Sequence, residues 1–196
     1  MKSLLAAAAL GLALSTASFT GAFAADSYKL DASHSQILFS YDHLGYSTTY
    51  GLISGFDGEM MLDENAIENS SISLEISLKD LFNTGWKDRD AHFLSADFLN
   101  ADANPVATFK STAVEKTGDD TAKITGDLTI AGTTKSVVLD TKLNKIGEHP
   151  FNGKYVAGFD ATTQINRADF GMNKFAGVGD VIDVKISVEA ERQPNS

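Results

Sequence analysis

"SISLEISL", residues 71–78, is the stretch that decides the fold class of this chain. Its even-numbered positions hold isoleucine or leucine, and its odd-numbered positions hold serine or glutamate. In a β-strand, successive side chains point to opposite faces, so a period of two places all the apolar residues on one face. The segment therefore predicts a strand with one face in the core and the other in water.

The same alternation recurs along most of the chain. It is found in residues 37–41, 122–130, 137–143, 157–165 and 182–190. Turn signals separate the later segments, at Gly118–Asp120, at Gly132–Thr134, and at Gly147–Gly153 with Pro150. Several amphipathic strands joined by short turns predict an antiparallel meander, and closing it into a barrel removes the exposed edges.

Residues 83–104 break this alternation. Their apolar side chains fall at roughly helical spacing, with charges between them: Trp86, Phe93, Leu94 and Phe98. Asn83 or Thr84 is suited to cap the start of a helix, and Ser95 to cap a second short turn before Pro105. We therefore predict a helical insertion between the third and fourth strands.

The N-terminus is typical of an export signal. Lys2 precedes the apolar run Leu4–Leu14, and Ala22-Phe23-Ala24 forms a small-x-small cleavage pattern. We predict a signal peptide over residues 1–24 and a single exported, periplasmic domain over residues 25–196. The apolar run is shorter than the roughly 20 residues that span a bilayer, so stable membrane insertion is not expected.

Composition narrows the function classes. The formal net charge is −10, and removing Lys2 with the signal peptide makes it one unit more negative. Such a surface repels phosphate backbones, so we expect no nucleic-acid partner and no anionic membrane surface as partner. The sequence contains no cysteine, so no disulfide supports the fold.

Four ordered stretches carry a family resemblance. They are "YKLDASHSQILFSYDHLG" (28–45), "RDAHFLSADFLNADANPVATF" (89–109), "GDLTIAGTTKSV" (126–137), and "INRADFGM" (165–172) with "VGD" (178–180). Together they resemble the YceI-like family of periplasmic polyisoprenoid-binding proteins over nearly all of the mature chain. The chain departs mildly at Phe93, where the family more often has leucine after the histidine.

The resemblance implies an all-β, lipocalin-like antiparallel β-barrel of about eight strands, with the helical insertion near its mouth. It implies a binding protein rather than an enzyme, which holds an isoprenoid lipid or a quinone in the lumen and carries or stores it in the periplasm. The bound lipid is then the ligand, with no further cofactor. The resemblance also implies a homodimer, because family members often form dimers.

The candidate ligand-binding residues come from the inward faces, the insertion and the late loop. They are Phe39, Tyr41, His43, Leu52, Phe56, Arg89, His92, Leu94, Phe98, Phe109, Phe159, Ile165, Arg167, Phe170, Met172 and Phe175. Small inward residues, such as Gly126 and Ala161, leave space between the large ones. The alternative is a lumen filled by side chains alone, as in a purely structural protein.

The loop 167–180 leaves two alternatives open. Its glycines permit sharp turns, so Phe170, Met172 and Phe175 can face inward as an apolar lid, or they can plug the core without a ligand. Arg167 needs a partner if it points inward, and Asp169 or Asp180 can pair with it. The other interpretation is that Arg167 contacts a ligand headgroup.

The histidines predict neither a metal site nor a catalytic site. His34 and His43 lie nine residues apart on extended chain, far beyond coordination distance, and we interpret His34 and Ser35 as a hydrogen-bonded pair at the first strand. The sequence lacks G-x-S-x-G. Arg89 and His92 share a helix face that is either solvated or directed at a headgroup. The rival function is a lipid-modifying hydrolase or isomerase that uses His43 or His92 at the barrel mouth.

Overall fold

The computed structural model describes residues 25–175 and 177–194. The predicted signal peptide, residues 1–24, lies outside the described residues. The strands are β1 (Asp26–Leu30), β2 (Gln36–His43), β3 (Ser47–Ser54), β4 (Asp57–Leu62), β5 (Ser71–Ser77), β6 (Phe82–Asn83), β7 (Val106–Lys116), β8 (Thr121–Ile130), β9 (Thr133–Glu148), β10 (Tyr155–Asn166) and β11 (Val181–Arg192). The α-helices are α1 (Leu78–Leu81) and α2 (Lys87–Leu94), and short 3-10 helices cover Ala32–His34, Ile67–Asn69 and Arg167–Phe170.

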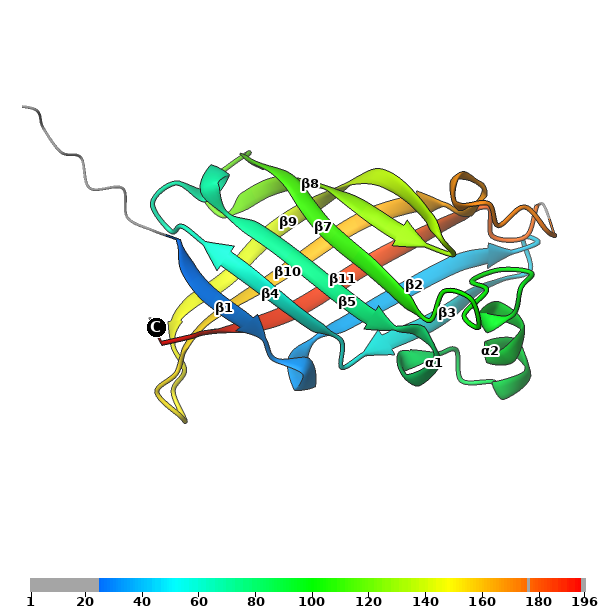
Figure 1. The fold of residues 1–196 in the computed structure, drawn as a ribbon, viewed down its shortest axis with the longest axis horizontal. Helices are drawn as coiled ribbons and strands as arrows, with labels where there is room; N and C mark the ends of the chain where they lie inside the picture. Colours follow the sequence, from blue (N-terminus) through cyan, green and yellow to red (C-terminus); the bar gives the residue numbers. More distant parts are fainter. Residues whose placement is uncertain (1–24, 176, 195–196) are drawn as a thin grey trace, which may run out of the picture.

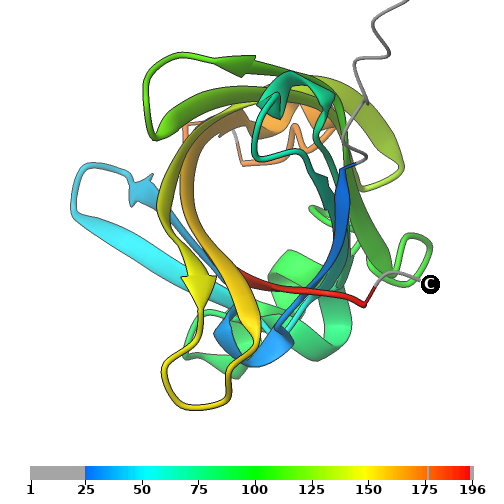
Figure 2. The same ribbon diagram turned by 90° about the vertical axis from the view of Figure 1, so that its left-hand side faces the viewer.

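These segments form one closed antiparallel barrel of eight long strands (Figure 1). Three of the long strands are interrupted, and each consists of two segments: β1 with β2, β3 with β4, and β5 with β6. β1 pairs with β4, and β2 pairs with β3. On the other side, β5 pairs with β4, and β6 pairs with β3. β7 to β11 follow in chain order, and β1 pairs with β11 through Leu30 opposite Ala190. The predicted all-β barrel of about eight strands is confirmed, and Figure 2 shows its strands arranged in a ring.

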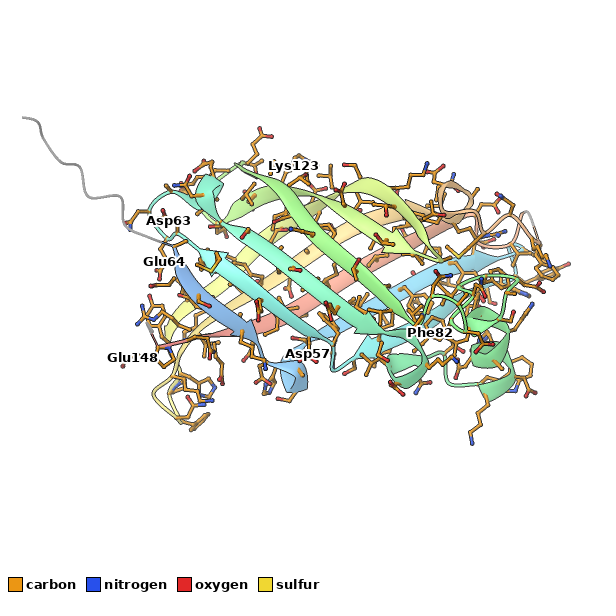
Figure 3. All side chains as sticks on the ribbon, in the orientation of Figure 1. Asp57, Asp63, Glu64, Phe82, Lys123 and Glu148 are labelled. Carbon is orange, nitrogen blue, oxygen red and sulfur yellow. The ribbon has the colours of Figure 1, made fainter. Side chains whose placement is uncertain are left out.

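The two ends of the barrel differ in what covers them. One end, called here the α2 end, carries the β2–β3 turn, both α-helices and the loop 167–180 (Figure 1). The other, called the terminal end, carries the start of β1, the end of β11 and the turns β4–β5, β7–β8 and β9–β10. The labelled side chains Glu64 and Glu148 mark the terminal end, and Phe82 lies toward the α2 end (Figure 3).

Two large aromatic rings lie against the barrel wall, each over a glycine of the neighbouring strand. A Cβ atom added to Gly51 on β3 would lie 2.0 Å from Cζ of Phe39 on β2. A Cβ atom added to Gly126 on β8 would lie 2.4 Å from Cζ of Phe109 on β7. Because glycine lacks a side chain, each ring can occupy the space along the wall instead of projecting to the barrel axis.

The helical insertion is confirmed between the third and fourth long strands, but its predicted start is wrong. Trp86 precedes α2 and makes no side-chain capping bond. Asn83 instead accepts a hydrogen bond from the Gly85 N–H at 2.7 Å, and Thr84 donates through its hydroxyl to Asp90. Ser95 does support the second short turn, since its hydroxyl accepts from the Asp97 N–H at 3.3 Å.

Leu78 also departs from the predicted strand, because it begins α1. The Ser77 hydroxyl donates to the Asp80 carboxylate at 2.6 Å, and the Leu78 N–H donates to the Pro105 carbonyl at 2.9 Å. Within residues 25–175 and 177–194, we find no helix with the length and apolar character needed to cross a bilayer.

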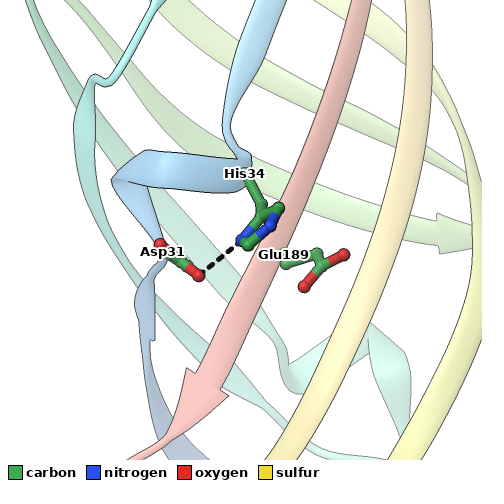
Figure 4. A group of neighbouring side chains, drawn as sticks. All are labelled: Asp31, His34 and Glu189. Carbon is green, nitrogen blue, oxygen red and sulfur yellow. Dashed lines mark hydrogen bonds and ion pairs between the residues drawn. The ribbon is translucent and has the colours of Figure 1, made fainter. Parts of the chain in front are cut away.

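Asp31 holds the break between β1 and β2. The Ser35 hydroxyl donates to the Asp31 carbonyl at 2.8 Å, and His34 Nδ1 lies 2.8 Å from Asp31 Oδ2 (Figure 4). The predicted His34–Ser35 pair is therefore wrong in its partners, because both side chains bind Asp31. Asp31, His34 and Glu189 place possible metal-ligand atoms within 4.8 Å of one another, and exposed acidic groups are common without an ion. The absence of a metal stays a prediction.

The Asp31–His34 pair makes stability depend on pH. Hydrogen bonds from His34 and Ser33 lower the pKa of Asp31 from 3.8 to about 2. The ionised carboxylate therefore adds to the free energy of unfolding above pH 3.8, and this stabilisation is lost as the pH falls toward 2. The hydrogen bond to Asp31 raises the pKa of His34 above 6.5. The stabilisation by protonated His34 is therefore complete below pH 6.5, and it is lost as the pH rises through the pKa of the folded protein.

We therefore expect His34→Ala to lower the urea midpoint most between pH 3.8 and 6.5, and less above that window. His149→Ala, in the β9–β10 turn, is the matched control. A difference between wild type and His34→Ala that stays constant from pH 4 to pH 9 contradicts this linkage.

Gly126→Ala should lower the free energy of unfolding by about 1–3 kcal/mol, because the new methyl group collides with the Phe109 ring. Gly158→Ala on β10 is the control, since its Cβ atom would have no neighbour nearer than 3.9 Å. We expect it to change the free energy of unfolding by less than about 1 kcal/mol. Equal urea midpoints for both variants would show that the ring does not depend on the glycine.

Candidate functional site

The barrel encloses a cavity of about 530 Å³ at the α2 end. Its wall comes from the inward faces of the strands, from α2 and from the loop 167–180. Most of the wall is aliphatic or aromatic, and the polar side chains that reach it include His43, Asp88, Arg89, His92 and Arg167. An apolar cavity with a few convergent polar groups is the usual form of a small-molecule site.

Most of the predicted ligand-binding residues line this cavity. They are Phe39, Tyr41, His43, Arg89, His92, Phe98, Phe109, Ile165, Arg167, Met172 and Phe175. Phe159 lines a second cavity, of about 240 Å³, which reaches the terminal end. The residues that strand alternation and helical spacing selected are far apart in the sequence, and most of them line one cavity.

Four predicted residues lie elsewhere. Leu52 points outward with 37% of its surface exposed, because β3 turns Gly51 and Ile53 toward the interior. Phe56 and Phe170 are buried but line neither cavity. Leu94 packs against the hydrophobic core. Apolar character alone placed these residues in the prediction, and it does not distinguish a lumen wall from other buried positions.

Several lining residues were missed. Ile182, Val184 and Ile186 face the lumen from β11, and the period of two already placed them on one face of that strand. Trp86 lines the mouth although 60% of its surface is exposed. Trp86 lies just before α2, and the turns of the insertion decide where its side chain points. Those turns have no periodic sequence pattern like that of the strands.

Arg167 is a structural residue of the loop. Its side chain is only 4% exposed, and Nε donates to the Gly179 carbonyl at 3.2 Å. The two terminal nitrogens donate to the carbonyls of Met172, Lys174 and Phe175 and to the Asp180 carboxylate. Arginine has five N–H donors, and all five are used here. Asp180, not Asp169, is therefore its partner, and no donor remains for a headgroup.

Arg89 differs from Arg167 because it keeps free donors. Its Nε donates to the Thr84 hydroxyl at 2.9 Å, and Nη2 donates to the Thr84 carbonyl at 2.6 Å. Among the residues that the structure describes, the other three of its five N–H donors have no partner. The half-buried guanidinium also lies 5.9 Å from the Trp86 ring centroid. Arg89 can therefore bind a carbonyl or an anion at the cavity mouth.

Aromatic rings join the loop to the insertion at the mouth. Phe175 stacks on Phe98 with ring centroids 5.8 Å apart, and His92 meets both rings edge-on. An ion pair between Lys174 and Asp97 spans the same junction and lowers the pKa of Asp97. Phe175 was predicted to face inward, but 53% of its surface is exposed, so it forms the rim of the cavity.

Comparisons with known proteins agree with this architecture. A family model described as a YceI-like domain matches residues 28–190. A UPF0312 protein of Pseudomonas putida (strain W619) is 40% identical over 195 residues, which cover 98% of this chain and 99% of that protein. The YceI protein of Campylobacter jejuni superposes with a TM-score of 0.69 at 29% identity, covering 78% of this chain and 90% of that one.

A polyisoprenoid-binding domain from Saccharophagus degradans has the same fold. It superposes with a TM-score of 0.65 at 14% identity, and the alignment covers 85% of this chain and 98% of that one.

The two arginines should respond differently to the same substitution. Arg167→Gln should lower the free energy of unfolding by about 3–5 kcal/mol, because it leaves buried carbonyls and a carboxylate without their donor. Arg89→Gln should cost about 1 kcal/mol, because its half-buried guanidinium makes two hydrogen bonds, both to Thr84. Urea unfolding measures both. An Arg167→Gln variant as stable as the wild type would contradict the structural role.

Proposed function

This chain belongs to the family of YceI-like domain proteins, and we propose that it binds the chain of an isoprenoid lipid in the lumen of its barrel. The ligand is a quinone or a polyprenyl compound, which the protein carries or stores in the periplasm. The observation that carries this proposal is the apolar cavity of about 530 Å³ inside a closed barrel.

The chemistry of the wall supports this class of ligand. An isoprenoid chain makes no hydrogen bonds, so it loses little when it leaves water for an aliphatic and aromatic cavity. Each Å² of apolar surface that it buries contributes about 25 cal/mol, and each methylene group about 0.8 kcal/mol. The description of the Saccharophagus degradans neighbour as a polyisoprenoid-binding domain supports the same ligand class.

The polar groups of the mouth support a headgroup position. Arg89 and His92 both line the cavity at the α2 end, and three N–H donors of Arg89 have no partner within residues 25–175 and 177–194. A quinone carbonyl or a phosphate placed there accepts hydrogen bonds from Arg89 while its chain extends into the barrel. Arg167 lines the same cavity but supports the loop, as its donors are all engaged.

We propose binding rather than catalysis. The neighbours of His92 are the Asp97 carboxylate, 3.7 Å from Nε2, and the rings of Phe98 and Phe175. The carboxylate and the two rings hold the imidazole at the rim, beside the aromatic contact between the loop and the insertion. The periplasmic location, the homodimer and the identity of the headgroup stay predictions.

Organic extracts of protein purified without detergent test the proposal by mass spectrometry. We expect a polyisoprenoid compound from the wild type and little or none from Phe175→Glu, because a carboxylate at the rim opposes entry of an apolar chain. Phe151→Glu is the matched control, since Phe151 is 93% exposed in the β9–β10 turn.

The same extraction separates headgroup binding from chain binding. Arg89→Gln should still yield neutral polyprenols but should lose quinones and polyprenyl phosphates. Wild-type extracts without any isoprenoid, from cells shown to contain them, would refute the proposed function. Equal yields from the Phe175→Glu and Phe151→Glu variants would show that the rim does not control entry.

A further inference from the structure

A second cavity, of about 240 Å³, continues the lumen toward the terminal end. Leu74, Leu139 and Ile186 line both cavities, so these three side chains, called here the neck, lie between the two spaces. The neck residues come from β5, β9 and β11. A chain that enters at the α2 end therefore meets the neck before it can reach the second cavity.

A row of small side chains makes room beyond the neck. Ala122 on β8 lies opposite Thr141 on β9, and Thr141 lies opposite Ala161 on β10. Ala161 in turn lies opposite the neck residue Ile186 on β11. All four line the second cavity. Three adjacent strands thus place two alanines and a threonine side by side on the cavity wall, and these short side chains leave space in the lumen.

Polar groups line the second cavity at the terminal end. Glu64 accepts hydrogen bonds from the hydroxyls of Tyr155 at 3.2 Å and Tyr28 at 3.4 Å. Lys116 and Asp120 also line the rim at the β7–β8 turn. Figure 3 shows Glu64 at this end of the barrel. An apolar chain gains nothing by displacing hydrogen-bonded and charged groups, so it ends before them.

We propose that the second cavity receives the distal end of the isoprenoid chain and thereby selects ligands by chain length. This inference rests on the proposed function and adds a specificity site to it. A short isoprenoid occupies the cavity at the α2 end only. A long one passes the neck and buries further methylene groups against the row Ala122, Thr141 and Ala161.

Two variants fill the second cavity from neighbouring strands: Ala161→Phe and Ala122→Phe. Thr162→Phe is the matched control, because Thr162 is the next residue on β10 and points outward. The probes are farnesol as the short chain and solanesol as the long chain, both presented in detergent micelles. Binding is followed through fluorescence of Trp86, which is the only tryptophan of the sequence and lines the mouth.

We expect each filled variant to bind solanesol at least about tenfold more weakly than the wild type. Two methylene groups kept out of the cavity already account for that factor. Farnesol affinity should stay within about twofold in every variant, and Thr162→Phe should bind both probes like the wild type. Because farnesol binding also reports an intact first cavity, it separates a filled chamber from a misfolded barrel.

Each other outcome has one meaning. Unchanged solanesol affinity in both filled variants, with both probes bound by the wild type, overturns the length selection and leaves the proposed function standing. A wild type that prefers neither probe also overturns it. A wild type that binds neither probe refutes the proposed function itself.

Discussion

The lumen depends on two aromatic rings that lie over glycines. An eight-stranded barrel has an interior that side chains can just fill, or that holds one small ligand. Phe39 and Phe109 are large enough to occupy the axis, but Gly51 and Gly126 let them lie along the wall. A bound apolar chain can then occupy the space that the two rings leave free along the barrel axis.

The two ends of the barrel differ in their polar groups. At the α2 end, all five N–H donors of Arg167 bind groups of the loop 167–180. These bonds hold the loop in the position where Phe175 stacks on Phe98 at the rim. Arg89 keeps three donors beside the opening. At the terminal end, Glu64 accepts hydrogen bonds from two tyrosine hydroxyls. In the proposed function, headgroup recognition, entry and chain length therefore fall to separate residues.

The strands could be predicted because alternation is a local property, whereas the eight-stranded barrel was implied by the family resemblance. Residues 71–77 and 182–190 show their inward faces directly, and the break in period at residues 83–104 marked the insertion. Other features depend on tertiary contacts that no local pattern encodes. Leu52 was predicted on the wrong face because the phase of β3 follows from its pairing with β2, and Phe159 belongs to a second cavity because of its height along the barrel. The division of roles between Arg167 and Arg89 became apparent only from their hydrogen bonds.

A crystal structure of the protein purified without detergent tests the central claim most directly. The account predicts elongated electron density along the barrel axis, beginning beside Arg89 and Trp86 and following the wall past Phe109. Density that crosses the neck at Leu139 would mark a long chain. A lumen collapsed onto inward-turned rings of Phe39 and Phe109, or filled with ordered water alone, would contradict the account.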